Sequence, residues 1–151
     1  MIIYRISDCR FINDLSGKGA AMFGGRWNSK DTYMLYTAES RALALLEAVA
    51  HIGRIPESGF CIATIEIPEE SIEILSAEKL PQTWASNPPP DTLKVTGDNF
   101  ISAGKYLALK VPSVLISEEH NYLLNPNHPD FKKVRITHMR PVSADERLFP
   151  Q

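Results

Sequence analysis

The sequence has few of the features that mark metal-binding or disulfide-rich proteins. It contains only 2 cysteines among 151 residues, and Cys9 and Cys61 form neither a CxxC pair nor part of a Cys/His cluster. The 4 histidines lack the H-E-x-x-H spacing of zinc enzymes, so we expect no metal site. We interpret both cysteines as reduced thiols of a cytoplasmic protein, because disulfides are rare in that compartment.

Long apolar runs and an excess of one charge are also missing. No segment approaches the roughly 18 apolar residues of a membrane span, and the apolar start before Arg5 is too short for a signal peptide. A formal net charge of -2 argues against direct binding of nucleic-acid phosphates by this chain. A Rossmann fingerprint, a P-loop and the G-x-S-x-G nucleophile elbow are all absent, so those enzyme classes have no support.

The length and composition of the chain predict one domain over residues 1–151, with an α+β fold. Hydrophobic patterning and turn residues divide the chain into short strands, two helices and loops. The expected strands cover residues 2–6, 34–37, 60–67, 72–75, 113–117 and 133–139. The expected helices cover 37–52, capped by Thr37 and ended by Gly53, and 97–110, opened by Gly97. Residues 8–33 and 81–96 are expected to be loops, and 121–129 a compact turn. Because no regular βαβ alternation occurs, the sheet should be compact and mainly antiparallel, with flanking helices.

The segment Gly24-Gly25-Arg26-Trp27-Asn28 is the most informative in the chain. The two glycines allow backbone conformations that side chains forbid. They are followed by the permanent cation of Arg26, the large ring of Trp27 and the amide of Asn28, which can cap a turn. The fork of Arg26 suits a diphosphate. The segment therefore indicates an anion site at the mouth of a pocket, with an Arg26–carboxylate pair that fixes the loop as the alternative.

Glu47 falls at the edge of the apolar arc of the first helix. A carboxylate there can act as an acid, as a base or as a stabiliser of developing positive charge. The alternative is a pair within the helix with His51 or Arg54. Ser113 follows Pro112 at the start of an expected strand, where its hydroxyl either orients a neighbouring carboxylate or is an ordinary strand-edge group.

Three further side chains have both a functional and a structural interpretation. Tyr36 ends a short strand and offers either a ring and phenol to a ligand or a packing group to the core. Trp27 has the same ambiguity. Asn125 precedes Pro126, where capping of the turn is its simplest role.

In this order, these segments resemble the RES family, which is named after a recurring Arg, Glu and Ser. The Arg is Arg26, the Glu is Glu47 in Leu43-Ala44-Leu45-Leu46-Glu47, and the Ser is Ser113 in Val111-Pro112-Ser113. Four other segments also match the family: Tyr4-Arg5-Ile6, Leu35-Tyr36-Thr37-Ala38-Glu39-Ser40, Asn121-Tyr122-Leu123-Leu124-Asn125-Pro126 and Asp145-Glu146-Arg147-Leu148. The resemblance covers nearly the whole chain.

The resemblance implies a bacterial toxin with a fold similar to that of ADP-ribosyltransferase toxins. Such toxins destroy cellular NAD, and some use inorganic phosphate as acceptor, which makes them NAD phosphorylases. NAD would be the substrate and phosphate the co-substrate, with no further cofactor. The implied partner is an antitoxin with a Xre-like helix-turn-helix region, which covers the active site and binds the operator. A homodimer, or a larger complex with the antitoxin, is the expected assembly.

The resemblance also implies roles for individual residues. Arg26 clamps the diphosphate, and Glu47 contacts ribose hydroxyls and stabilises the cation. Ser113 orients Glu47 or the substrate, and Tyr36 packs against nicotinamide. The expected substrate contacts come from four other side chains: Arg5, Trp27, Asn28 and Asn125.

Two other functions fit the same residues. One is transfer of ADP-ribose to a macromolecule, and the other is a non-catalytic nucleotide-binding or interaction module.

Overall fold

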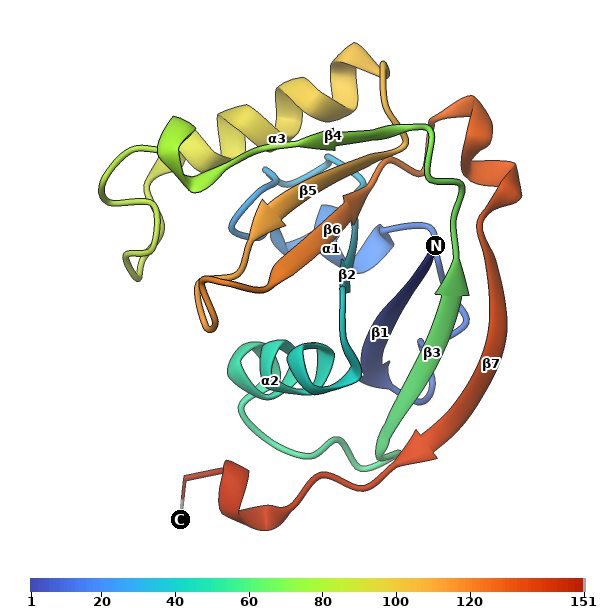
Figure 1. The fold of residues 1–151 in the computed structure, drawn as a ribbon. Helices are drawn as coiled ribbons and strands as arrows, with labels where there is room; N and C mark the ends of the chain where they lie inside the picture. Colours follow the sequence, from blue (N-terminus) through green and yellow to red (C-terminus); the bar gives the residue numbers. More distant parts are fainter. Residues whose placement is uncertain (151) are drawn as a thin grey trace.

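The computed structural model describes residues 1–150, which form one mixed sheet with three α-helices (Figure 1). The strands are β1 (Ile2–Asp8), β2 (Leu35–Ala38), β3 (Phe60–Glu66), β4 (Ile72–Ile74), β5 (Ala108–Pro112), β6 (His120–Leu124) and β7 (Arg135–Val142). The α-helices are α1 (Lys18–Phe23), α2 (Arg41–Ile52) and α3 (Asp91–Ala103), and short 3-10 turns are η1 (Ala77–Lys79), η2 (Pro129–Lys133) and η3 (Glu146–Leu148). None of the helices over residues 1–150 has the length and apolar character needed to span a membrane.

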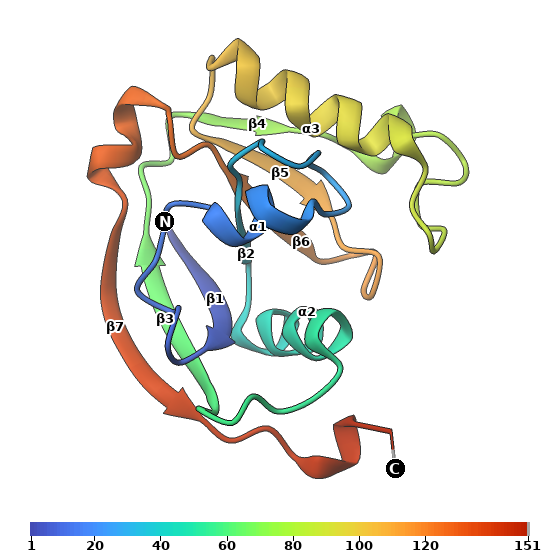
Figure 2. The same cartoon turned by 180° about the vertical axis from the view of Figure 1, so that it is seen from behind.

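The sheet has seven strands in the order β4-β5-β6-β2-β1-β3-β7. Every neighbouring pair is antiparallel except β4 and β5. The predicted α+β fold with a mainly antiparallel sheet is therefore confirmed. Both views show α2 beside β1 and α3 along β4 and β5 (Figures 1 and 2).

The pairing register assigns side chains to the two faces of the sheet. Tyr4 pairs with Ala38, which pairs with Asn121, which pairs with Val111. Because paired residues point to the same side, these four share one face, and their sequence neighbours share the other. We call the face of Tyr4 and Asn121 the helix face, because α2 and α3 pack on it.

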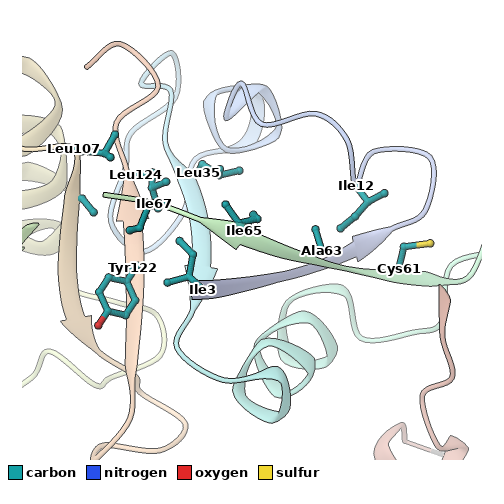
Figure 3. Close-up of a cluster of buried hydrophobic side chains, with 11 residues drawn as sticks. Ile3, Ile12, Leu35, Cys61, Ala63, Ile65, Ile67, Leu107, Tyr122 and Leu124 are labelled. Carbon is teal, nitrogen blue, oxygen red and sulfur yellow. The ribbon is translucent and has the colours of Figure 1, made fainter. Parts of the chain in front are cut away.

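Two apolar clusters cover the helix face. Under α2, Ile6, Ala38 and Ile62 contact Leu43 and Ala48. Under α3, the cluster comprises Trp27, Met34, Leu93, Phe100, Leu109, Val111 and Leu123. The opposite face carries a third cluster, in which Ile3, Ile65 and Leu124 meet Ile12 from the segment after β1 (Figure 3). Burial on both faces makes the middle of the sheet a rigid support for the residues at its strand ends.

Helix α2 begins three residues later than its sequence predicts. Ser40, not Thr37, is its N-cap, and the Ser40 side chain accepts from Leu43 N. Thr37 instead belongs to β2, and its hydroxyl donates to the carbonyl of Tyr122 across the sheet. The predicted end at Gly53 is confirmed, since Gly53 has a φ of 73° and caps the helix.

The second long helix lies earlier than predicted. It covers Asp91–Ala103, so Gly97 is in its interior, and Gly104 ends it in the left-handed conformation. Residues 108–112 form β5 between β4 and β6, not the end of a helix. Sheet pairing on both sides has overridden the helical pattern there.

Three other sequence predictions are corrected. Residues 113–117 form a turn after β5, and 121–124 belong to β6 in place of a compact turn, which is confined to the residues after it. The segment 8–33 contains the short helix α1. Of these segments, 121–124 pairs with the distant strands β2 and β5.

The two cysteines are joined in a disulfide, which corrects the prediction of free thiols. Cys9 and Cys61 are separated by 52 residues, and their sulfurs are bonded. Ser7, two residues before Cys9, pairs with Cys61 across β1 and β3, so the antiparallel register brings the two cysteines together. The spacing of the two cysteines in the sequence does not predict that they lie close together.

Reduction of the disulfide should lower the free energy of unfolding by about 2–4 kcal/mol, because a cross-link over this span restricts the unfolded chain. The measurement is denaturant unfolding with and without dithiothreitol. A double Cys9→Ala, Cys61→Ala variant should lose the response to reductant. Two thiols that react with Ellman's reagent in unfolded, unreduced protein would instead support the free-thiol prediction.

Candidate active site

Glu47 is the centre of a partly buried polar cluster on the helix face. It lies in the second half of α2 and is half-buried. Its Oε1 accepts two hydrogen bonds, from Ser113 Oγ at 2.8 Å and from Asn121 Nδ2 at 2.6 Å. The alternative pair with His51 or Arg54 is not formed within residues 1–150. The carboxylate is thus held by two neighbouring strands and not by its own helix.

The sheet register explains why these three side chains meet. Val111 pairs with Asn121, and Ser113 is two residues beyond Val111. Ser113 and Asn121 therefore project to the helix face at the same end of β5 and β6, toward α2. Ser113 is fully buried, and its Oγ also accepts from Leu115 N at 3.1 Å, so the following turn fixes its rotamer.

Arg26 contributes the positive charge of the site. Its Nη1 donates to the carbonyls of Trp84 and Ser86, each at 3.0 Å, so it connects its loop to the proline-rich segment. No carboxylate of the described chain forms an ion pair with it, so the alternative of an Arg–carboxylate clamp is wrong. Partial burial lowers the pKa of Arg26, and the nearby charge of Glu47 opposes this effect. The guanidinium remains a cation at neutral pH, with capacity for an anion.

The rest of the arginine loop is fixed by buried groups. Trp27 is only 3% exposed and packs in the cluster under α3. Asn28 is fully buried and donates to three backbone carbonyls, those of Ala20, Ser29 and Thr32. Such internal bonding leaves little freedom in the loop that carries Arg26.

Tyr36 is the link between this loop and the sheet. Its hydroxyl accepts from Trp27 N at 3.1 Å and donates to Asn28 Oδ1 at 2.7 Å. Burial raises the pKa of Tyr36 well above its usual value, so the phenol stays protonated. A Cβ on Gly25 would approach the Tyr36 hydroxyl oxygen to 2.7 Å, so glycine is required there for a close approach.

Helix α3 supports the same loop from the other side. Asp98 Oδ1 accepts from Ser29 N at 2.9 Å. Gly97 lies against the loop backbone, and a Cβ there would overlap the carbonyl oxygen of Trp27. The Gly97-Asp98 pair that was predicted to open the helix is thus its contact with the arginine loop.

Comparison with known protein families identifies the family of this chain. The model of the RES domain matches residues 2–148. The chain belongs to the RES domain family.

Its relatives include a "Prs ADP-ribosylating toxin" of Sphingobium sp. (strain YBL2), 38% identical over 91% of this chain and 88% of that protein. "Toxin Res" of Yersinia enterocolitica is 37% identical over 98% of this chain and 99% of that protein. The chain is thus similar over almost its whole length to toxins of the RES type. Its fold matches a chain of the "Crystal structure of the M.tuberculosis MbcT-MbcA toxin-antitoxin complex" with a TM-score of 0.74 and 16% identity, over 94% of this chain and 84% of that one.

The structure brings together most, but not all, of the predicted site residues of the RES domain. Glu47 and Ser113 are in direct contact, and Arg26 lies close enough to Glu47 for their charges to interact. Tyr36, Trp27 and Asn28 form the support of the arginine loop; their side chains are largely buried, and their hydrogen bonds are internal.

Arg5 and Asn125 lie outside this cluster. Arg5 pairs with Ala63 and projects to the face opposite Glu47, where Nη1 donates to the carbonyls of Phe11 and Ile12. Burial lowers the pKa of Arg5. Asn125 Nδ2 donates to the carbonyl of Ile101, and its Oδ1 caps the turn at Asn127. Both side chains have structural partners in this conformation.

Asn121 is the site residue that sequence reasoning missed. It lies in the segment 121–126 that carries the family resemblance, but that segment was predicted as a turn. A strand assignment would have placed residue 121 on the same face as residues 38 and 111, next to Ser113. The missing signal was therefore the strand pairing, not the residue type.

Gly97→Ala should lower the free energy of unfolding by about 1–3 kcal/mol, as overpacking typically does, because the new methyl group collides with rigid backbone. Gly19→Ala is the matched control. A Cβ there meets nothing within 4 Å, so helix propensity should make it neutral or stabilising by up to about 1 kcal/mol. Urea unfolding of both variants measures the difference, and equal stability would contradict the close approach.

Proposed function

We propose that this toxin depletes NAD by cleaving its nicotinamide–ribose bond, with inorganic phosphate as acceptor. The observation that carries the proposal is the Glu47 carboxylate, which is fixed through Oε1 and lies close enough to Arg26 for their charges to interact, although the two form no ion pair. Cleavage of this bond develops positive charge on the ribose, as in glycoside hydrolysis. A fixed carboxylate stabilises that charge, and an arginine binds the diphosphate.

Each residue then has a defined role. Arg26 holds the diphosphate, and Glu47 Oε2, which has no hydrogen-bond partner among residues 1–150, faces the ribose. Ser113 keeps the carboxylate oriented. Tyr36 and Trp27 hold the arginine loop, and the Tyr36 ring packs against nicotinamide.

The bond changes are simple. The bond from the ribose anomeric carbon to the pyridinium nitrogen breaks, and its electron pair leaves with neutral nicotinamide. A phosphate oxygen then bonds to the same carbon and gives ADP-ribose 1-phosphate. Nicotinamide needs no proton to leave, so the site does not require a general acid. Because NAD is a cytoplasmic metabolite, we place the toxin in the cytoplasm.

Glu47→Gln should lower the rate of nicotinamide release about 10²–10³-fold, because it removes the charge that stabilises the transition state. Release is followed by NMR with purified protein and NAD. Glu73→Gln, the same change on an exposed residue of β4, is the control and should keep full activity. A folded Glu47→Gln protein with near-normal activity would refute the assignment.

The acceptor is identified in the same assay. The assay is run in one buffer with phosphate and in one without it. With phosphate present, phosphorolysis gives ADP-ribose 1-phosphate, whereas a glycohydrolase gives free ADP-ribose in both buffers. Binding of NAD without nicotinamide release under both conditions would instead support a non-catalytic nucleotide-binding module.

A second candidate function is favoured by the name of the Sphingobium relative, an ADP-ribosylating toxin. In that case a side chain of a macromolecule replaces phosphate as the nucleophile. NAD labelled in its adenine separates the two: the label enters a macromolecule during ADP-ribosylation and remains in a small product during phosphorolysis.

We also propose that an antitoxin with a Xre-like helix-turn-helix region neutralises this toxin and supplies binding to the operator. The structural neighbour from M. tuberculosis is itself part of a toxin–antitoxin complex, which supports a partner of this kind. Co-expression with the product of the adjacent gene should restore growth of a host that expresses the toxin. The toxin should shift operator DNA only when that product is present.

A further inference from the structure

Only one of the two polar atoms of the Asn121 amide has a hydrogen-bond partner among residues 1–150. Its Nδ2 donates to Glu47 Oε1 at 2.6 Å, whereas its Oδ1 is a buried side-chain atom without a hydrogen-bond partner in the described part of the chain. Buried acceptors in folded proteins are almost always paired, so an exception calls for an explanation.

The explanation lies in the orientation that Glu47 imposes. Turning the amide over would bring Oδ1 against Oε1, so that two acceptors would face each other at hydrogen-bonding distance. An ionised carboxylate therefore fixes the amide with its NH₂ group inward. The unpaired Oδ1 therefore accompanies the hydrogen bond from Nδ2 to Glu47.

Both hydrogen bonds to Glu47 converge on one oxygen. Ser113 reaches Oε1 from the end of β5, and Asn121 reaches it from β6. Two donors at different angles fix the plane of the carboxylate, which one donor could not do. Oε2 accepts no hydrogen bond from the residues that the structure describes.

We propose that Asn121 is a positioning residue for Glu47, which fixes the orientation of the carboxylate through Oε1 and leaves Oε2 for the ribose. This inference rests on the proposed cleavage of NAD for its catalytic consequence. Its structural part, control of the orientation of Glu47 by the Asn121 amide, is independent of the substrate.

Other charged groups surround Glu47 but do not replace this contact. Arg26 interacts with it from the arginine loop through space. Ser40 Oγ donates to Glu119 Oε2, and Glu39 lies 3.3 Å from His120, so those groups have partners of their own. Two other titratable side chains belong to the elements around the site: His51, one turn beyond Glu47 on α2, and the protonated Tyr36, which interacts with Arg26.

Asn121→Asp is the decisive variant, since it keeps the size of the side chain and replaces a donor by a second carboxylate. Two carboxylates at this distance share a proton, so the apparent pKa of the pair rises. We expect kcat at pH 7 to fall at least roughly tenfold, KM for NAD to change less than about threefold, and the acidic limb of the pH–rate profile to move up by about one pH unit or more. Asn127→Asp, the same change at an exposed site beyond the other end of β6, should alter none of these.

Asn121→Leu separates positioning from folding. It removes the donor together with the unpaired Oδ1, so the urea midpoint should be unchanged or higher while kcat falls. A fall in kcat that only follows loss of folded protein would assign Asn121 a structural role and overturn the proposal.

A readout without turnover keeps the two proposals distinct. NMR titration of the 13C-labelled Glu47 carboxyl should show its midpoint about one pH unit or more higher in Asn121→Asp than in the native protein. An unchanged midpoint and pH profile would overturn the positioning role even if Glu47→Gln is inactive. A shifted midpoint in a protein that never releases nicotinamide would support the contact and refute NAD cleavage.

Discussion

The two hydrogen bonds that converge on Glu47 Oε1 connect the helix face of the sheet to its chemistry. Neither donor belongs to the helix that carries the carboxylate. Ser113 and Asn121 are adjacent only because β5 and β6 pair in one register, and a shift of either strand by one residue would place the two side chains on opposite faces. The position of the carboxylate therefore depends on the pairing of the central strands, and the buried clusters on both faces keep that pairing in place.

The arginine loop is held by a separate set of contacts. Trp27 is embedded in the cluster under α3, while Gly97 and Asp98 of that helix touch the loop backbone. Tyr36, from β2, joins the loop to the sheet. The carboxylate and the guanidinium thus sit on independently supported elements, which fixes the separation between them. A substrate with an anion at one end and a developing cation at the other requires such a fixed separation.

The sequence predicts the fold class and the main groups of the site because these depend on local pattern. The apolar arc of 41–52 and the alternation of 60–66 are strong, and Arg26, Glu47 and Ser113 carry the family resemblance. Pairing between distant strands is not encoded locally. It explains why β5 was mistaken for a helix end, why Asn121 was missed, and why the Cys9–Cys61 bond was not foreseen. Arg5 was misjudged for the same reason, since only the register shows which face it occupies.

The two charges of the site attract each other, yet the structure does not pair them. Arg26 donates to the carbonyls of Trp84 and Ser86, and Glu47 accepts from neutral donors. A direct ion pair would neutralise both groups and close the space between them, and a substrate would have to break it before binding. Neutral hydrogen-bond partners fix the orientation of each charged group and leave its charge intact. Both charges can therefore interact with a ligand. This is the physical reason to interpret the cluster as a candidate active site and not as a structural ion pair.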